Sequence, residues 1–221
     1  MAILLSKIRN LLQYIPVGER LSELFYANWM VVVSIGLLGA MEASITSIVA
    51  VTITAFLVNL IWGFIDGITV MYGMIIGRVQ RMSVVRRLQA GDISARKEAR
   101  DSLNDTILLA LNEKEIDKVI DLIAEKGHVL DYDARPLKSD IGYMLGIVFL
   151  DIIMVLPLIV PLYLISDYHT AVYTSHMISV AIFAILGAAY AKKLNNNMWV
   201  TAILFAVMGT ILATVVYEAG W

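Results

Sequence analysis

The sequence contains no cysteine, which excludes disulfide bonds, zinc–thiolate sites and iron–sulfur clusters. Charged residues are scarce as well: they make up 16% of the chain, whereas about a quarter is usual in soluble domains. No P-loop, dinucleotide-binding fingerprint or nucleophile elbow is present. No basic stretch interleaved with aromatic residues indicates nucleic acid binding. We therefore expect no enzyme, no permanently bound cofactor and no nucleic-acid partner.

Apolar residues make up 59% of the chain, and the mean hydropathy is +0.77. They are gathered in runs that approach or exceed the roughly 20 residues that a helix needs to cross a bilayer. The sequence therefore predicts an all-α integral membrane protein with five transmembrane helices, in contact with membrane lipid. The predicted spans cover about residues 28–46, 48–77, 141–165, 170–191 and 198–218.

The pattern divides the chain into four parts. Residues 1–26 are predicted to form an N-terminal amphipathic helix in the membrane interface, because apolar residues recur on one side of it. Residues 27–77 carry spans one and two, residues 78–140 form a small cytoplasmic helical domain, and residues 141–221 carry spans three to five.

Within the cytoplasmic domain, two short helices are indicated by their end signals. Asp92 or Ser94 is predicted to cap a helix that reaches about Leu111. Asn112 begins a capping-box sequence, and Gly127 ends the helix that follows it.

The basic residues predict the orientation. With five spans, all 17 lysines and arginines fall on one side of the membrane, and most of them lie in residues 78–140. The positive-inside rule makes that side cytoplasmic. We therefore expect a multi-pass protein of the cell membrane with its N-terminus inside and its C-terminus outside.

Asp66 is the principal candidate for function. It lies in the apolar stretch 59–74, which also contains Gly63, Gly67 and Gly73. A carboxylate at membrane depth is costly in free energy and faces a bundle interior, a cavity or a partner. The alternative is an aspartate that only fixes helix packing through a hydrogen bond.

Other side chains in the spans extend this candidate site. Carboxylates with thioethers form a ligand set that suits a divalent transition metal such as iron(II) or manganese(II). Methionine is also common as adaptable packing in helices, which is the alternative for each of the methionines. The candidate metal ligands besides Asp66 are Met41, Glu42, Met71, Met74, Asp151 and Met154.

His176 has a pKa near neutrality in its free form, which suits a proton relay together with Asp66. Its alternative is a hydrogen bond between helices. A weaker set of candidates for metal capture lies in the cytoplasmic domain. Lysines run beside these acids, which is typical of a solvated, salt-bridged helix face. The acids are Glu98, Asp101, Asp105, Glu113, Asp117 and Asp121.

Several stretches resemble the vacuolar iron transporter family, and the chain is similar to prokaryotic proteins grouped with it. The amphipathic start, the five spans and the helical insertion after span two are similar to that family. The most specific stretches are 59–67, with its Asp-Gly pair, and 156–161, with Leu186-Gly-Ala-Ala-Tyr190 and Met198-Trp199 further along.

The resemblance implies a homodimer that exports iron(II) or manganese(II) from the cytoplasm in exchange for protons. It implies metal binding by Asp66, Met41 and Glu42. The transported metal is cargo and not a resident cofactor. Two other functions stay open at this point. One is a non-transporting scaffold that binds a partner through the helices of residues 94–126, and the other is a channel or transporter for another solute.

Overall fold

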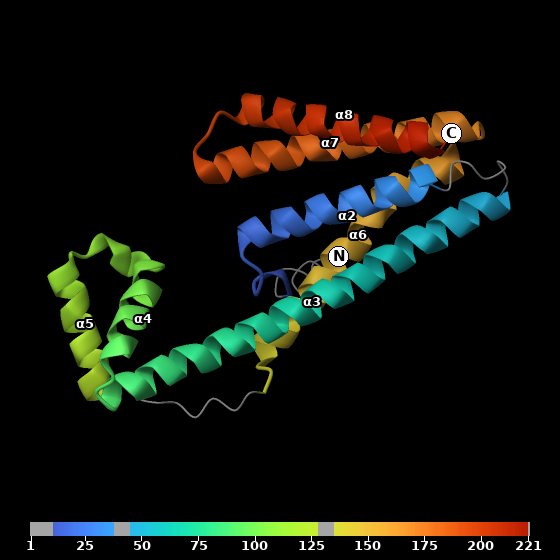
Figure 1. Ribbon diagram of the computed structural model, residues 1–221. Coiled ribbons are helices and arrows are strands. Elements are labelled where there is room, and N and C mark those ends of the chain that lie inside the picture. Colours follow the sequence, from blue (N-terminus) through green and yellow to red (C-terminus); the bar gives the residue numbers. More distant parts are fainter. Residues whose placement is uncertain (1–10, 38–44, 128–134, 221) are drawn as a thin grey trace. The chain divides into compact units, whose positions relative to one another are not determined.

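The computed structural model describes residues 11–37, 45–127 and 135–220, and all of its regular structure is helical (Figure 1). The described residues form seven α-helices and one short 3₁₀-helix. They are α2 (Val17–Leu37), α3 (Ile45–Gln89), α4 (Ile93–Asn104), η1 (Ile107–Ala110), α5 (Glu113–Lys126), α6 (Lys138–Leu164), α7 (Tyr168–Leu194) and α8 (Met198–Gly220).

Four of these helices are long and apolar enough to cross a membrane, so the chain is a multi-pass membrane protein. They are α3, α6, α7 and α8, and they correspond to predicted spans two to five. The predicted first span begins within α2 and extends into residues 38–44, which lie outside the described residues. α2 also runs unbroken through residue 26, where the sequence predicted an interfacial helix to end.

The contacts divide the chain into two compact units. The membrane unit comprises Met1–Val70 and Lys138–Trp221, and the insertion unit comprises Met71–Leu137. The long helix α3 therefore contributes its first half to the membrane unit and its second half to the insertion unit.

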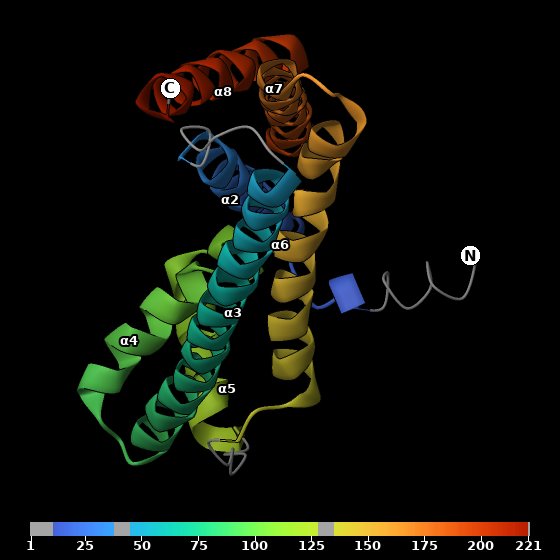
Figure 2. The same ribbon diagram turned by 90° about the vertical axis from the view of Figure 1, so that its right-hand side faces the viewer.

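In the membrane unit, α7 and α8 lie side by side, and α2 packs against both of them and against α6 (Figure 1 and Figure 2). Buried aliphatic side chains from α2, α3, α6 and α7 meet in one apolar cluster. Its fully buried members include Ile35, Val51, Val155 and Val172, one from each helix. This cluster fixes the relative positions of the four helices.

α2 is antiparallel to α7, and polar side chains join the two helices. The hydroxyl groups of Ser22 and Tyr190 are 2.7 Å apart, and Asn28 donates from Nδ2 to the carbonyl of Ser179 at 3.3 Å. Asn28 is fully buried. These contacts hold the polar residues of one face of α2 against α7, away from lipid.

The insertion unit confirms most of the predicted helix ends. Asp92 caps α4, and hydrogen bonds from Ser94 and from Arg87 lower the pKa of its carboxyl to about 2. Asn112 forms a capping box with Glu115 at the start of α5. α4, however, ends at Asn104 and not near residue 111, because Thr106 caps the separate 3₁₀-helix η1.

The insertion unit has an apolar core of its own, formed by the end of α3 with α4 and α5. Ile120 on α5 is fully buried in it, whereas Leu122 on the same helix is exposed. Replacing Ile120 by alanine leaves a cavity and should lower the free energy of opening this unit by about 2–5 kcal/mol.

Amide hydrogen exchange over α4 and α5 of the whole protein measures this change. Leu122→Ala is the matched control and should leave the exchange rates nearly unchanged. Equal acceleration by both variants would contradict the described core.

Candidate functional site: an acidic cavity in the membrane unit

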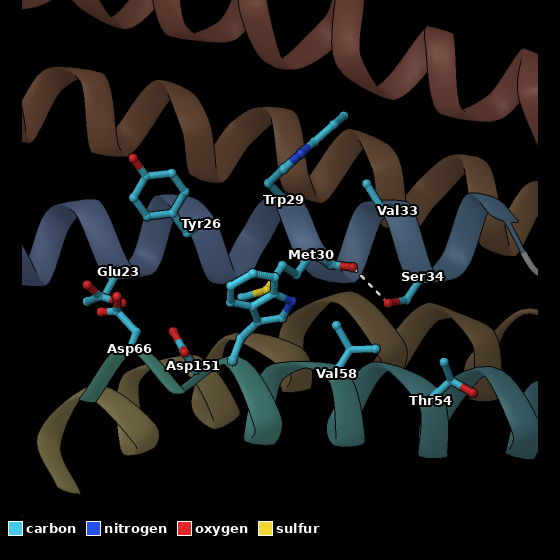
Figure 3. Close-up of a pocket in the computed structure, with 11 residues that line it drawn as sticks. Glu23, Tyr26, Trp29, Met30, Val33, Ser34, Thr54, Val58, Asp66 and Asp151 are labelled. Carbon is cyan, nitrogen blue, oxygen red and sulfur yellow. Dashed lines mark hydrogen bonds between the residues drawn. The ribbon is translucent and has the colours of Figure 1, made fainter. Parts of the chain in front are cut away.

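A cavity of about 830 Å³ lies in the membrane unit, lined by residues of α2, α3 and α6 (Figure 3). Three of the lining residues are acidic and none is basic. The others are mostly apolar or aromatic. The lining residues are Glu23, Tyr26, Trp29, Met30, Val33, Ser34, Thr54, Val58, Trp62, Asp66 and Asp151.

The spacing of these residues explains why two helices present them to one space. On α3, Val58, Trp62 and Asp66 are four residues apart and therefore share one face of the helix. On α2, Glu23 and Met30 are seven residues apart, which again places them on one side. Each helix thus contributes a carboxylate at one end of a stripe and apolar side chains along the rest.

The acids gather at one end of the cavity. The carboxyl groups of Glu23 and Asp66 point toward each other, with Asp151 beside them (Figure 3). Glu19, one turn earlier on α2, is close enough to interact electrostatically with Asp66. Carboxylates this close repel one another unless a proton or a cation lies between them. This end of the cavity therefore gathers acidic side chains from α2, α3 and α6.

Asp151 is the most buried of the three acids, with 1% of its surface exposed, and its Oδ1 has no hydrogen-bond partner. A buried carboxylate oxygen without a partner is costly, unless water or a cation occupies the space beside it. Asp151 is therefore a candidate contact for a positively charged or hydrogen-bonding ligand at this end of the cavity.

Two glycines of α3 let α6 approach closely enough to bring Asp151 to Asp66. A Cβ atom on Gly63 would lie 2.9 Å from both Asp151 Oδ2 and Val148 Cα. A Cβ atom on Gly67 would lie 2.9 Å from Met144 Cγ and 3.0 Å from its carbonyl oxygen. Any larger residue at either position forces the two helices apart.

Two of the predicted site residues, Asp66 and Asp151, line the same cavity. The structure also adds Glu23, which sequence reasoning missed because residues 1–26 were assigned to the membrane interface, and Met30, which was not distinguished from the other apolar residues of the predicted first span. The signal that could have identified them is their shared helix face with Tyr26 and Val33.

Three of the predicted methionine ligands, Met71, Met74 and Met154, are not lining residues of the cavity. Met154 is buried on α6 but does not line the cavity, and Met71 and Met74 belong to the insertion unit. Met41 and Glu42 lie outside the described residues. Met30 is therefore the one described lining residue that carries a thioether.

His176 is 3% exposed on α7 and is not among the lining residues of the cavity. It hydrogen-bonds to the backbone carbonyl of Val32, and its ring lies edge-on to that of Tyr217, with centroids 6.2 Å apart. Its Nε2 has no partner. This placement fits the alternative of a hydrogen bond between helices, and the relay with Asp66 stays a prediction.

Three of the predicted cytoplasmic capture residues form ion pairs. Glu98 pairs with Arg87 at 2.8 Å, Asp121 pairs with Arg96 at 2.7 Å, and Asp117 pairs with Arg100. Such pairing is the pattern of a salt-bridged surface. Asp101 lies on α4, Asp105 is the C-cap of α4, and Glu113 is the first residue of α5.

In the part of the chain that the structure describes, no group of three or more histidine or acidic side chains is arranged to hold a metal ion. The three acids of the cavity thus surround a space without forming a closed coordination shell. A comparison with protein-family models finds no match, and a comparison with curated proteins finds none either. The resemblance to vacuolar iron transporters therefore stays a hypothesis that rests on the quoted residues.

The contact between α3 and α6 can be tested with a pair of glycine substitutions. Gly63→Ala places a methyl group against the backbone of α6 and should destabilise the protein by about 1–3 kcal/mol. Gly73→Ala on the same helix meets no described atom within 4 Å and should be neutral, or stabilising by up to about 1 kcal/mol. Thermal unfolding of the purified protein in detergent measures both effects. If Gly63→Ala is as stable as Gly73→Ala, the close approach of α3 and α6 is wrong.

Proposed function

We propose that this protein is a transporter that moves a cation across the membrane in exchange for protons. The observation that carries the proposal is the acidic end of the cavity. Glu23, Asp66 and Asp151 line it with no basic residue, and Asp151 has an unpartnered oxygen. Ionisable groups at membrane depth are expensive and typically mark ion or proton pathways.

The facing carboxyl groups of Glu23 and Asp66 supply the coupling in this proposal (Figure 3). Two adjacent carboxylates repel each other, so a proton and a cation are alternative ways to neutralise the pair. A cation that enters between them favours the doubly ionised pair, so the proton leaves. Cation binding should therefore weaken as the pH falls, since protons and the cation compete for the same carboxyl groups.

The five-span topology is part of this proposal. α2 has 21 residues and spans about 31 Å, close to the thickness of the hydrocarbon core. Its polar groups do not require water, since Asn28 faces α7 and Glu23 faces the cavity. If α2 crosses the membrane, the acidic end of the cavity lies toward the cytoplasmic side, where the positive-inside rule places the basic residues.

Iron(II) or manganese(II) is the cargo that we propose for a first test, and a homodimer is the assembly implied by the family resemblance. The carboxylates of Asp66, Glu23 and Asp151 with the thioether of Met30 form a ligand set that such ions accept. The described arrangement would have to tighten around the ion for them to coordinate it, because no preformed metal cluster is present among the described side chains.

A scaffold function is the second candidate, favoured by one observation in the insertion unit. Ile107 and Leu109 of η1 are 88% and 68% exposed. Apolar side chains presented so openly are typical of contact with another surface. This function would depend on η1 and not on the cavity.

Asp66→Asn tests the transport proposal. The amide cannot release a proton or attract a cation, so proton-linked flux should fall to the level of protein-free liposomes. The measurement is uptake of manganese(II) or iron(II) into proteoliposomes, with a pH-sensitive dye on the opposite face.

Glu218→Gln removes one carboxylate from the exposed surface of α8 and is the matched control, with flux equal to wild type. Flux of metal and protons that is unchanged in a folded Asp66→Asn protein would overturn the role of the cavity. Loss of function after replacement of Ile107 and Leu109, with the cavity intact, would favour the scaffold.

A further inference from the structure

The cavity is much larger than a bare metal ion requires. Its volume of about 830 Å³ falls within the range of about 300–1,000 Å³ that is typical of small-molecule sites. A divalent ion held by protein oxygens needs several of them within about 2.0–2.6 Å. The described side chains provide no such cluster, so the space suits a ligand that has a body as well as a charge.

The walls beside the acids are apolar and aromatic. Trp62 is four residues before Asp66 on α3, so its indole and the carboxylate lie on the same face of the helix. Met30 and Val58 line the adjoining part of the cavity, and Tyr26 and Trp29 border it from α2. Trp62 is 53% exposed, and indole rings attract cations through their faces.

The far end of the cavity carries only weakly polar groups. Ser34 and Thr54 line it, and the Ser34 hydroxyl already donates to the carbonyl of Met30 at 2.8 Å. Along α2, Glu23 and Ser34 are 11 residues apart, which corresponds to about 16 Å. The cavity is therefore amphipathic along its length, with negative charge at one end and apolar surface over the rest.

We propose that the cavity binds an amphipathic organic cation, such as a quaternary ammonium or phosphonium ion. The positive centre lies at the acidic end, among Glu23, Asp66 and Asp151. The apolar part lies along Trp62, Met30 and Val58. This inference rests on the proposed cation–proton exchange and names the class of cation that the cavity accepts. Under the proposed exchange, the cation replaces a proton at the facing carboxyl groups of Glu23 and Asp66 (Figure 3), and that proton passes to the solution.

Tetraphenylphosphonium is a suitable probe, because it is permanently charged and carries its own apolar surface. Binding to the purified full-length protein is measured by calorimetry, and proton release by a dye in weakly buffered detergent solution. Wild-type protein should bind the probe and release protons. Asp66→Asn should lose both, and Trp62→Leu should weaken binding by about tenfold. Trp199→Leu is the matched control, since Trp199 is 72% exposed on α8, outside the cavity, and it should bind as wild type does.

Each outcome separates this inference from the proposed function. Binding that depends on Asp66 and Trp62 but not on Trp199 supports the inference. Equal binding by wild type, Asp66→Asn and Trp62→Leu indicates partition into detergent and overturns it. Asp66-dependent binding and transport of manganese(II), with no site for tetraphenylphosphonium, overturns the inference but leaves the proposed exchange intact. If a folded protein binds neither cation and releases no protons, both proposals fail.

Discussion

The burial of carboxylates in an apolar membrane unit is the constraint on which the site depends. Asp66, Asp151 and Glu23 line one cavity without a basic partner, although each charge is costly away from water. A proton or a cation between the facing carboxyl groups of Glu23 and Asp66 (Figure 3) would reduce that cost, and a ligand beside the buried, unpartnered Oδ1 of Asp151 would do the same there. Gly63 then explains why the groups meet at all, since a side chain there would separate α3 from α6.

Much of the fold could be predicted from the sequence, because the signals that decide it are local. The candidate spans α3, α6, α7 and α8 follow from long apolar runs, and the capping box at Asn112 follows from residue type alone. The end of α4 could not be predicted in the same way. Thr106 can start a turn or continue a helix, and its side chain bonds to Leu108 within η1.

The candidate site was only half predictable, for a different reason. Asp66 stands out because a carboxylate is rare in an apolar run, and Asp151 stands out for the same reason. Glu23 does not, because Glu19 and Arg20 precede it and make the start of α2 look like a surface helix. A methionine does not stand out from an apolar run in this way, because it is itself apolar. Tertiary packing alone places Met30 in the cavity and leaves Met154 outside it.

The two walls of the cavity are held in place by different neighbouring helices. The shape of the cavity can therefore depend on what occupies it. α2 is joined to α7 by the contacts of Ser22 with Tyr190 and of Asn28 with Ser179. The wall on α3 is held against α6 at Gly63 and Gly67. The carboxyl groups of Glu23 and Asp66 face each other from the two walls (Figure 3). Two ionised carboxylates there repel each other, unless a proton or a cation lies between them. The protonation state of the pair and the separation of the walls are therefore coupled by the geometry itself.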